Sequence, residues 1–349
     1  MEVKLEIQWS IGLDQAETLD PLVLRLLEAV ERGQSLRGAA AECGASYRHA
    51  WGLMRQWENR LGSALLDLER GRGASLTRLG RALLWSRRRA EARLRPALDS
   101  FGAEVEQELA ALTADSTPLR LVASHDLAIE LLRDHLVAAG RRGFNVLYRG
   151  SLDAVRQLIA GHCDLAGYHL PDLPDSGRIE ADFRRLMPSD EFQSIRFVDR
   201  SQGLILPFGN PFGVRALQDL AGNRLRFLNR QAGSGTRLLF DELLAKAGLR
   251  PDQIHGYDAE EFTHLAVAAM VASGAADAGF GMQAAAERFG LDFVPMVREH
   301  YLLAFRKAER DGEWIKALLH LLNDNQELRQ AIAALPGYDC GAMGEAWPQ

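Results

Sequence analysis

The sequence predicts three successive parts: a small α+β head, a long helix and a larger α/β domain. Short helical segments with glycine-containing turns occupy residues 20–80, and a helical stretch rich in Arg, Ala and Leu covers residues 77–113. From Pro118 onward, short apolar runs such as the GLILP of residues 203–207 alternate with helical patterns. That alternation is typical of βαβ units around a parallel or mixed sheet.

Composition fits a globular protein of two or three domains. The chain has 349 residues, of which 47% are hydrophobic and 25% charged, both ordinary values. The net charge of -6 argues against wholesale coating of nucleic acid but leaves room for a local basic face. Cys43, Cys163 and Cys340 lack the spacing of a disulfide framework or a zinc site, so we expect reduced thiols.

Targeting and membrane-spanning patterns are not seen in the sequence. The first ten residues, MEVKLEIQWS, lack a basic region followed by an apolar stretch. No run approaches the ~20 apolar residues that span a bilayer. We therefore expect a cytoplasmic protein with no membrane partner.

Residues 35–61 predict two helices joined by a tight turn. Ser35 caps the first helix, which ends at Gly44, and Ser46 caps a second helix that runs to about Leu61. Small residues at Ala39 and Ala40 let the helices cross closely, as a helix-turn-helix requires.

The second helix of this pair has an apolar face and a polar face. At ~100° per residue, one side is expected to be core, namely Ala50, Leu53, Met54, Trp57 and Leu61. The opposite side carries Arg48, Trp51, Gly52, Arg55 and Asn59. Arg and Asn suit base edges and phosphates, and glycine permits close approach to a groove. The residues expected to contact double-stranded DNA from this helix are Ser46, Tyr47, Arg48, His49, Trp51 and Arg55.

Residues 65–80, LLDLERGRGASLTRLG, predict a β-hairpin wing. Gly71 and Gly73 supply its turn, and Arg70 and Arg72 lie at its tip, where they can reach phosphates or the minor groove. The alternative is a small helical bundle with a merely solvated basic face. The exposed helix face and the basic wing together favour DNA binding.

Residues 79–112 predict a long helix interrupted by Pro96. An approximate apolar stripe suits pairing between two chains, so we expect a homodimer or higher homo-oligomer; packing within one chain is the alternative. The stripe comprises Leu83, Leu84, Ala90, Leu94, Leu98, Val105 and Leu109. The cluster Arg87, Arg88 and Arg89 fits either a solvated face or added DNA contacts.

Polar residues follow the predicted strands of the α/β domain, where such sheets bind ligands. Ser124, His125 and Asp126 follow a strand, and Asp126 is expected to be a helix cap. Gly150 and Ser151 follow the strand 145–148, before a helix from about Leu152 to Ala160. His169 ends a later strand and is either a cleft residue or a structural one.

The strongest ligand signal is RFLNRQAGSGTRLLFDELL, residues 226–244. A strand feeds a Gly/Ser loop that opens a helix, so N–H groups, hydroxyls and the helix dipole converge. Arg230 or Arg237 adds a fork of donors. The spacing is not that of a Walker A loop, and an ordinary capped helix is the alternative. The expected ligand residues are Ser124, His125, Ser151, His169, Arg230, Gly233, Ser234, Gly235, Thr236 and Arg237.

Residues 22–84 resemble the winged helix-turn-helix head shared by LysR-type and molybdate-responsive ModE-type transcription regulators. SYRHAW (residues 46–51), Trp57 and GRGASLTRLG (residues 71–80) look closer to the ModE type. In that family this segment and the wing contact DNA, which implies Ser46, Tyr47, Arg48 and Arg72.

Residues from Pro118 to about Leu322 resemble the type II periplasmic-binding-protein fold, in the form fused to ModE- or LysR-like heads. The matching motifs are ASHDL, RGSLDAVRQLIAGHCDLAGYHL, NRQAGSGTR and VASGAADAGFG. The resemblance implies two lobes, a hinge crossed twice and a ligand in the cleft between the lobes. The expected domains are a winged head (1–80), a linker and dimerisation helix (81–117) and a two-lobed domain (118–349), with lobe I at about 118–203 and 292–349 and lobe II at about 204–291.

The resemblance implies a ligand-responsive regulator rather than an enzyme, with no cofactor and no metal. Relatives of this family are associated with molybdate or tungstate, which the hydroxyls of Ser124, Ser151, Ser234 and Thr236 suit. His125, His169 and Arg230 add charge that formate or another small carboxylate can use, so such a carboxylate is the alternative effector. The other function classes are an enzyme on the same fold and a DNA-binding protein without an effector.

Overall fold

The computed structural model describes residues 3–12, 16–69, 73–113, 119–139, 144–173, 177–222 and 225–348. The chain divides into two compact units, the head unit, Glu6–Ala92, and the C-terminal unit, which contains Arg93–Gln349 and the described residues before Glu6. Each unit has its own hydrophobic core. None of the described helices is long and apolar enough to cross a bilayer.

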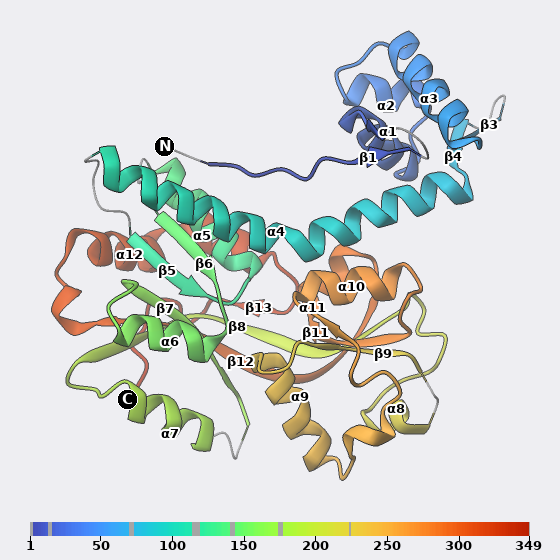
Figure 1. The fold of residues 1–349 in the computed structure, drawn as a ribbon. Coiled ribbons are helices and arrows are strands. Elements are labelled where there is room, and N and C mark those ends of the chain that lie inside the picture. Colours follow the sequence, from blue (N-terminus) through green and yellow to red (C-terminus); the bar gives the residue numbers. More distant parts are fainter. Residues whose placement is uncertain are drawn as a thin grey trace. The chain divides into compact units, whose positions relative to one another are not determined.

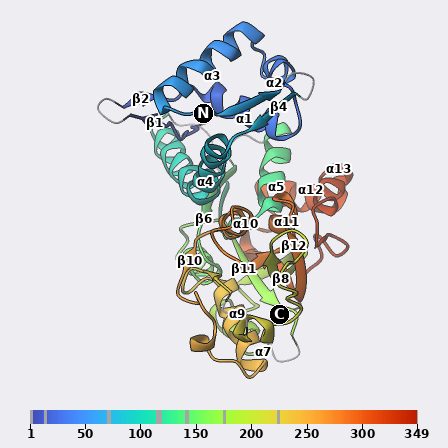
Figure 2. The ribbon, with the colours of Figure 1, turned by 90° about the vertical axis from the view of Figure 1, so that its right-hand side faces the viewer.

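The described part of the head unit is a bundle of three helices with two two-stranded antiparallel sheets, β1-β2 and β3-β4 (Figures 1 and 2). Asp20, Ser35 and Ser46 cap the three helices by accepting backbone N–H groups, and Trp57 is 1% exposed in the shared core. The helices are α1 (Pro21–Glu31), α2 (Leu36–Glu42) and α3 (Tyr47–Leu61), and the strands are β1 (Ser10–Ile11), β2 (Glu17–Thr18), β3 (Leu66–Glu69) and β4 (Gly73–Leu76).

The long helix α4 (Arg78–Thr113) is continuous, so the expected interruption at Pro96 is wrong. Pro96 lies inside the helix, where it removes one backbone hydrogen bond. Buried side chains on both sides of the proline, Ala92 and Ala103, anchor the helix. Packing of this kind keeps a helix continuous even where one internal hydrogen bond is missing.

The apolar stripe expected along α4 is divided between two roles. Leu84 is buried in the core of the head unit, and Leu83 packs against that core and is partly buried. The reason is that α4 begins inside the head unit, so its first turns complete that core. The apolar side chains that α4 exposes lie further along, at Leu94, Phe101, Val105 and Leu112.

The described part of the C-terminal unit is built on a nine-stranded mixed sheet with the order β10-β9-β11-β8-β12-β7-β5-β6, and β13 pairs with β8. The strands are β5 (Leu119–Ala123), β6 (Phe144–Tyr148), β7 (Leu165–Pro171), β8 (Phe192–Leu206), β9 (Phe227–Arg230), β10 (Glu260–Glu261), β11 (Ala278–Met282), β12 (Asp292–Arg306) and β13 (Tyr338–Asp339). The helices are α5 (Leu127–Ala138), α6 (Ser151–Ile159), α7 (Gly177–Leu186), α8 (Gln218–Gly222), α9 (Gly235–Lys246), α10 (His264–Ala272), α11 (Gln283–Arg288), α12 (Glu313–Asp324) and α13 (Gln326–Ala333), with 3-10 turns at Pro251–Gln253 and Lys307–Glu309.

Two long antiparallel strands, β8 and β12, join the lobes of this unit. One part of β12 pairs with β7 in lobe I, and the end of β8 pairs with β11 in lobe II. Each strand is 15 residues long and passes from one lobe to the other without a loop (Figure 1). The hinge is therefore crossed twice, and the two-lobed α/β architecture that the sequence predicts is confirmed.

Candidate functional site

Two helices from different lobes begin at the same place in the C-terminal unit. Ser151 is the first residue of α6, and Gly235 is the first residue of α9. A Cβ added to Gly235 would lie 3.8 Å from Ser151 Oγ, so the two N-termini meet. Because helix N-termini carry unsatisfied N–H groups and partial positive charge, this meeting point favours an anion.

Each lobe places one imidazole beside a hydroxyl at this point. Ser151 Oγ lies 3.0 Å from His169 Nδ1, and Thr236 Oγ1 lies 3.5 Å from His264 Nε2. The other ring nitrogens, His169 Nε2 and His264 Nδ1, are buried and have no hydrogen-bond partner among the described residues. Two ring nitrogens that are buried without partners predict a ligand that supplies the missing hydrogen bonds.

Burial keeps both imidazoles neutral. It lowers the pKa of His169 and of His264 well below the usual value, and the nearby guanidinium groups of Arg200 and Arg230 lower both pKa values further. A neutral imidazole offers one donor and one acceptor. The two rings therefore add hydrogen-bonding capacity to the site without adding charge.

Arg230, at the end of β9, is a buried cation whose hydrogen bonds are incomplete. Its Nη2 donates to the Phe262 carbonyl at 2.8 Å, and its Nε donates to Gln231 Oε1 at 3.3 Å. The Nη1 atom is buried with no partner in the described chain. Burial, reinforced by repulsion from Arg200, lowers the pKa of Arg230 to about 9. An anion at Nη1 would satisfy both the free donor and the charge.

A second buried guanidinium, Arg200 on β8, is fully neutralised by carboxylates. It pairs with Asp126 and with Glu299, its cross-strand neighbour on β12. Tyr338 Oη donates to the same Asp126 at 2.8 Å. Burial opposes the charge of Arg200, but the two carboxylates raise its pKa. Arg200 thus joins both hinge strands to α5, while Arg230 keeps a free donor.

The Gly/Ser loop before α9 is shaped for its own helix start. Gly233 has a φ of +79°, which favours glycine. Ser234 Oγ accepts the Arg237 N–H at 3.2 Å, so this hydroxyl caps α9. The Arg237 guanidinium donates to the Arg230 carbonyl at 3.2 Å and to Asp241 at 3.3 Å. The donors of Arg237 thus hold the loop rather than point to a ligand.

The residues after β5 also have partners of their own. The Ser124 carbonyl accepts from Tyr301 Oη at 3.2 Å. His125 Nε2 lies 2.9 Å from Glu130 Oε1, and its ring is 5.0 Å from that of Tyr148. Asp126 accepts the Ala128 N–H at 2.7 Å, which confirms the expected helix cap. This cap is also buried against Arg200, a contact that the sequence pattern does not reveal.

Three residues of this region were not among the expected ligand residues: His264, Arg200 and Gln202. Gln202 is fully buried, and neither atom of its amide has a hydrogen-bond partner in the described residues. The sequence did contain a signal for two of these residues, because the polar side chains of Arg200 and Gln202 lie within the strand β8. A buried polar group in such a run requires a partner. His264 opens a helix of small residues, and that pattern predicts close packing rather than a ligand contact.

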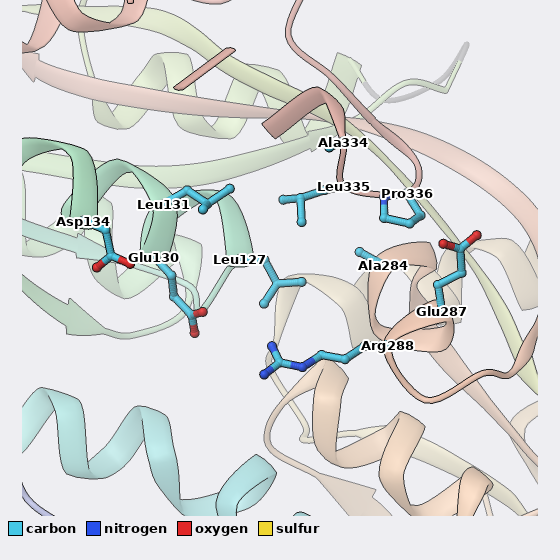
Figure 3. A pocket seen from close by; sticks show the side chains of 10 residues that line it. All are labelled: Leu127, Glu130, Leu131, Asp134, Ala284, Glu287, Arg288, Ala334, Leu335 and Pro336. Atoms are coloured by element: carbon cyan, nitrogen blue, oxygen red, sulfur yellow. The ribbon is translucent and has the colours of Figure 1, made fainter. Parts of the chain in front are cut away.

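A separate surface pocket of about 510 Å³ lies between α5, α11 and the turn before β13. Leu127 and Leu335 form part of its apolar lining, and the side chains of Glu130 and Arg288 extend toward each other (Figure 3). None of the ten expected ligand residues lines this pocket. Of the predicted ligand residues, Ser151, His169 and Gly235 lie close together at the starts of α6 and α9.

In the head unit, α3 presents the residues expected to contact DNA. Ser46 caps the helix by accepting the His49 N–H at 3.2 Å. Tyr47 and Trp51 are each 42% exposed although they are aromatic. The Arg55 guanidinium lies 5.4 Å from the Trp51 ring centre and pairs with Glu58 at 3.3 Å. Arg48 is also exposed, and together these groups form a polar and aromatic surface.

The sequence predicted two further basic regions, the wing tip and the cluster Arg87, Arg88 and Arg89. Arg72 and the rest of the expected wing tip, like the predicted boundary at residues 117–118, lie outside the described residues. Arg87 pairs with Glu91 at 2.7 Å, and Arg88 pairs with Glu31 at 2.7 Å. The pair of Arg88 with Glu31 ties α4 to α1 inside the head unit, so both arginines have structural contacts.

Two known protein families match this chain, one in the C-terminal unit and one in the head unit. Residues 134–323 match the family described as PBP superfamily domain, which is 190 of the 349 residues. Residues 23–81 match the family described as bacterial regulatory helix-turn-helix protein, LysR family.

Similar proteins and solved structures extend this comparison. The uncharacterized protein YvgK of Bacillus subtilis (strain 168) is 31% identical over 243 residues, covering 69% of this chain and 78% of YvgK. An uncharacterized Clostridium pasteurianum protein, from the 5' region of a ferredoxin 2Fe-2S gene, is 35% identical over 113 residues, covering 31% of this chain and 96% of that protein. An H2O2-bound cysteine-to-serine mutant of Corynebacterium glutamicum OxyR is 18% identical, with a TM-score of 0.45 and coverage of 91% of this chain and 94% of OxyR. Full-length BenM is 17% identical, with a TM-score of 0.42 and coverage of 90% and 97%.

Proposed function

This chain belongs to the PBP superfamily domain family and carries a LysR-type helix-turn-helix domain, and from that premise we propose a regulator whose affinity for its operator responds to a small oxyanion bound between the lobes. Molybdate or tungstate is the effector we place first. Formate or another small carboxylate is the alternative. We further propose that the regulator works in the cytoplasm as a homodimer or higher homo-oligomer.

The single observation that carries the effector proposal is a set of buried polar atoms without partners in the described structure. Arg230 Nη1, His169 Nε2 and His264 Nδ1 are buried without a partner, and the other ring nitrogens lie beside Ser151 and Thr236 in the first turns of α6 and α9. One cationic donor and neutral ring nitrogens from both lobes suit an anion with several oxygen acceptors. A tetrahedral oxyanion presents four such oxygens, whereas formate presents two, which is why molybdate and tungstate come first.

The DNA proposal rests on the exposed face of α3. Its N-terminal residues Tyr47, Arg48 and His49 and the side chains Trp51 and Arg55 are all exposed. The N-terminal part of a recognition helix usually meets base edges in the major groove. The close match of this head to the ModE type remains part of the proposal.

The oligomer proposal rests on the part of α4 in the C-terminal unit. Leu94, Phe101, Val105 and Leu112 are exposed and follow spacings of seven, four and seven residues. Such spacing places apolar side chains on one side of a helix, as in paired helices. Phe101 is 62% exposed and Leu112 is 83% exposed, so a second copy of this helix would bury substantial apolar area.

The test of the effector is calorimetric titration of the full-length protein with molybdate, tungstate, sulfate and formate in turn. We expect tight binding of molybdate or tungstate and a change in affinity for an operator selected from random duplexes. Tight binding of formate alone would replace the preferred effector with the alternative. The absence of a measurable heat of binding for all four anions would overturn the oxyanion proposal.

The test of DNA recognition is a pair of arginine variants. We expect Arg48→Ala to lower operator affinity while leaving the heat of anion binding unchanged. Arg32→Ala is the matched control, because Arg32 lies after α1 and pairs with Glu42 away from α3. Equal operator affinity in the two variants would remove Arg48 from the recognition surface.

A further inference from the structure

One face of α4 touches both lobes of the C-terminal unit. In lobe I, the Tyr148 N–H donates to Ser100 Oγ at 3.0 Å, and Asn145 Nδ2 donates to the Ala103 carbonyl at 3.3 Å. In lobe II, Glu261 Oε2 lies 3.0 Å from Arg93 Nε. Arg93 is the first residue of α4 that belongs to the C-terminal unit. The helix that continues into the head unit is therefore attached to lobe II by an ion pair close to that boundary.

The carboxylate in this ion pair, Glu261, is buried and lies beside the candidate ligand site. It is 2% exposed, and in the parallel pairing of β10 with β9 it is the register partner of Arg230. The Gln231 N–H donates to the Glu261 carbonyl at 3.1 Å, which fixes the two strands together. Burial raises the pKa of Glu261, and attraction to Arg93 and to Arg230 opposes that rise. One buried carboxylate is thus stabilised by two cations with different surroundings.

We infer that Glu261 and Arg93 form a relay that transmits the occupancy of Arg230 to helix α4. This inference rests on the proposed function, because Arg230 carries the free donor of the oxyanion site. Without an anion, Glu261 pairs directly with Arg93 and is attracted at longer range by Arg230, its register partner, with which it forms no ion pair in the described structure. An anion at Arg230 competes for that guanidinium, so Glu261 then depends on Arg93 for its counter-charge. Occupancy of the cleft strengthens the attachment of α4 to lobe II.

The relay predicts effects of opposite sign from the two halves of one ion pair. Glu261→Gln removes a negative charge beside the bound anion, so molybdate should bind more tightly, by about threefold or more. Arg93→Ala leaves Glu261 with Arg230 as its sole counter-charge, so the carboxylate competes with the anion and molybdate should bind more weakly. A merely structural ion pair would weaken binding in both variants. Both variants should also lose the response of DNA affinity to molybdate.

The experiment measures two quantities in the full-length protein. Calorimetry gives the affinity for molybdate, and a binding assay gives the ratio of operator affinities with and without saturating molybdate, using an operator selected from random duplexes. In the wild type we expect a ratio of about fivefold or more in either direction. In Glu261→Gln we expect tighter molybdate binding and a ratio near one. Arg149→Ala is the matched control, because Arg149 pairs with Glu104 of α4 at 3.4 Å but belongs to lobe I.

The possible outcomes separate this inference from the proposed function. Two results together would support the relay. Glu261→Gln would bind molybdate more tightly and show a ratio of operator affinities near one, and Arg149→Ala would keep the wild-type ratio. A wild-type ratio in Glu261→Gln would overturn the relay and leave the oxyanion proposal intact. Failure of the wild type to bind molybdate, tungstate, sulfate or formate would overturn the proposed function and the relay with it.

Discussion

At the scale of single residues, the charge of Arg230 is the feature on which the proposed effector site depends. Arg200 and Arg230 are both buried, but only Arg200 pairs with carboxylates in the described structure. The sequence predicted Arg230 because it ends a strand before a Gly/Ser loop. It did not predict His264 or Arg200, because their importance comes from residues that lie far away in the chain, such as Asp126 and Glu299.

We expect Arg230→Met to lower the affinity for molybdate by about 10-fold to 100-fold. The methionine removes a charged hydrogen bond, which contributes about 1.5–3 kcal/mol. Calorimetry measures the loss. Arg226→Ala is the control, because Arg226 is exposed and pairs with Asp277 at 2.6 Å on the outside of the same strand region. Similar affinities in the two variants would show that Arg230 is not part of the binding site.

The two buried imidazoles predict a loss of stability in mild acid. The pKa values of His169 and His264 are lowered in the folded protein, chiefly by burial. The unfolded chain binds these protons near pH 6.5, so their contribution is complete above about pH 6.5 and is lost as the pH falls. Each ring then costs about 1.4 kcal/mol per pH unit. Urea unfolding of the ligand-free protein at pH 7.5 and 5.5 measures the effect.

Variants identify the source of this pH dependence. His264→Gln should make the free energy of unfolding less sensitive to pH over this interval, because glutamine does not titrate. His169→Gln should have the same effect, because burial also lowers the pKa of His169. An equal pH dependence in wild type and His264→Gln would contradict the assignment.

At the scale of the element, local patterns predicted helices and caps better than they predicted where a helix ends. Ser35 and Ser46 cap their helices as expected, because a cap depends on residues three positions away. Pro96 was expected to interrupt α4 and does not, because packing of buried residues along that helix outweighs the local preference. Packing also changes the role of the apolar stripe predicted along α4, because Leu84 belongs to the core of the head unit.

Two glycines of the head unit should respond in opposite ways to alanine. A Cβ at Gly80 would lie 2.2 Å from the Leu65 carbonyl oxygen, so Gly80→Ala should destabilise the head by about 1–3 kcal/mol. A Cβ at Gly52 meets nothing within 4 Å in the described structure, so Gly52→Ala should stabilise α3 by about 0.5–1 kcal/mol. Thermal unfolding measures both changes.

Gly52→Ala also tests the approach of α3 to DNA. If α3 enters a groove with Gly52 against the duplex, the added methyl group should lower operator affinity while the head becomes more stable. Stability and affinity would then change in opposite directions. Unchanged operator affinity in Gly52→Ala would place Gly52 away from the DNA surface.

At the scale of the whole molecule, the architecture was easier to predict than the effector. Alternating strands and helices indicate an α/β domain, and the resemblance to a known two-lobed fold implied the hinge. The proposed effector depends on buried polar groups of Arg230, His169 and His264 that have no partner in the described structure. Those three residues come from β9, β7 and α10, and no spacing in the sequence encodes their convergence.

Oligomer formation provides a test at this scale. We expect Phe101→Glu to convert the protein to a monomer, because it places a charge in the middle of the exposed apolar stripe of α4. Light scattering coupled to gel filtration measures the mass. Phe208→Glu is the control, because Phe208 is 83% exposed but lies in a loop after β8. An unchanged mass for Phe101→Glu would refute pairing through this stripe.

The hinge made of β8 and β12 has a consequence for the timing of the response. Ser151, Arg230, Thr236 and His264 are all less than 10% exposed, so we expect an effector bound among them to be enclosed by the two lobes. Its departure requires the lobes to separate, and two continuous strands can separate the lobes only by bending. The dissociation rate is then set by the opening motion rather than by the contacts alone. If an effector binds there, as we propose, the regulator would keep its transcriptional state for the lifetime of the closed form, and brief drops in effector concentration would not change that state.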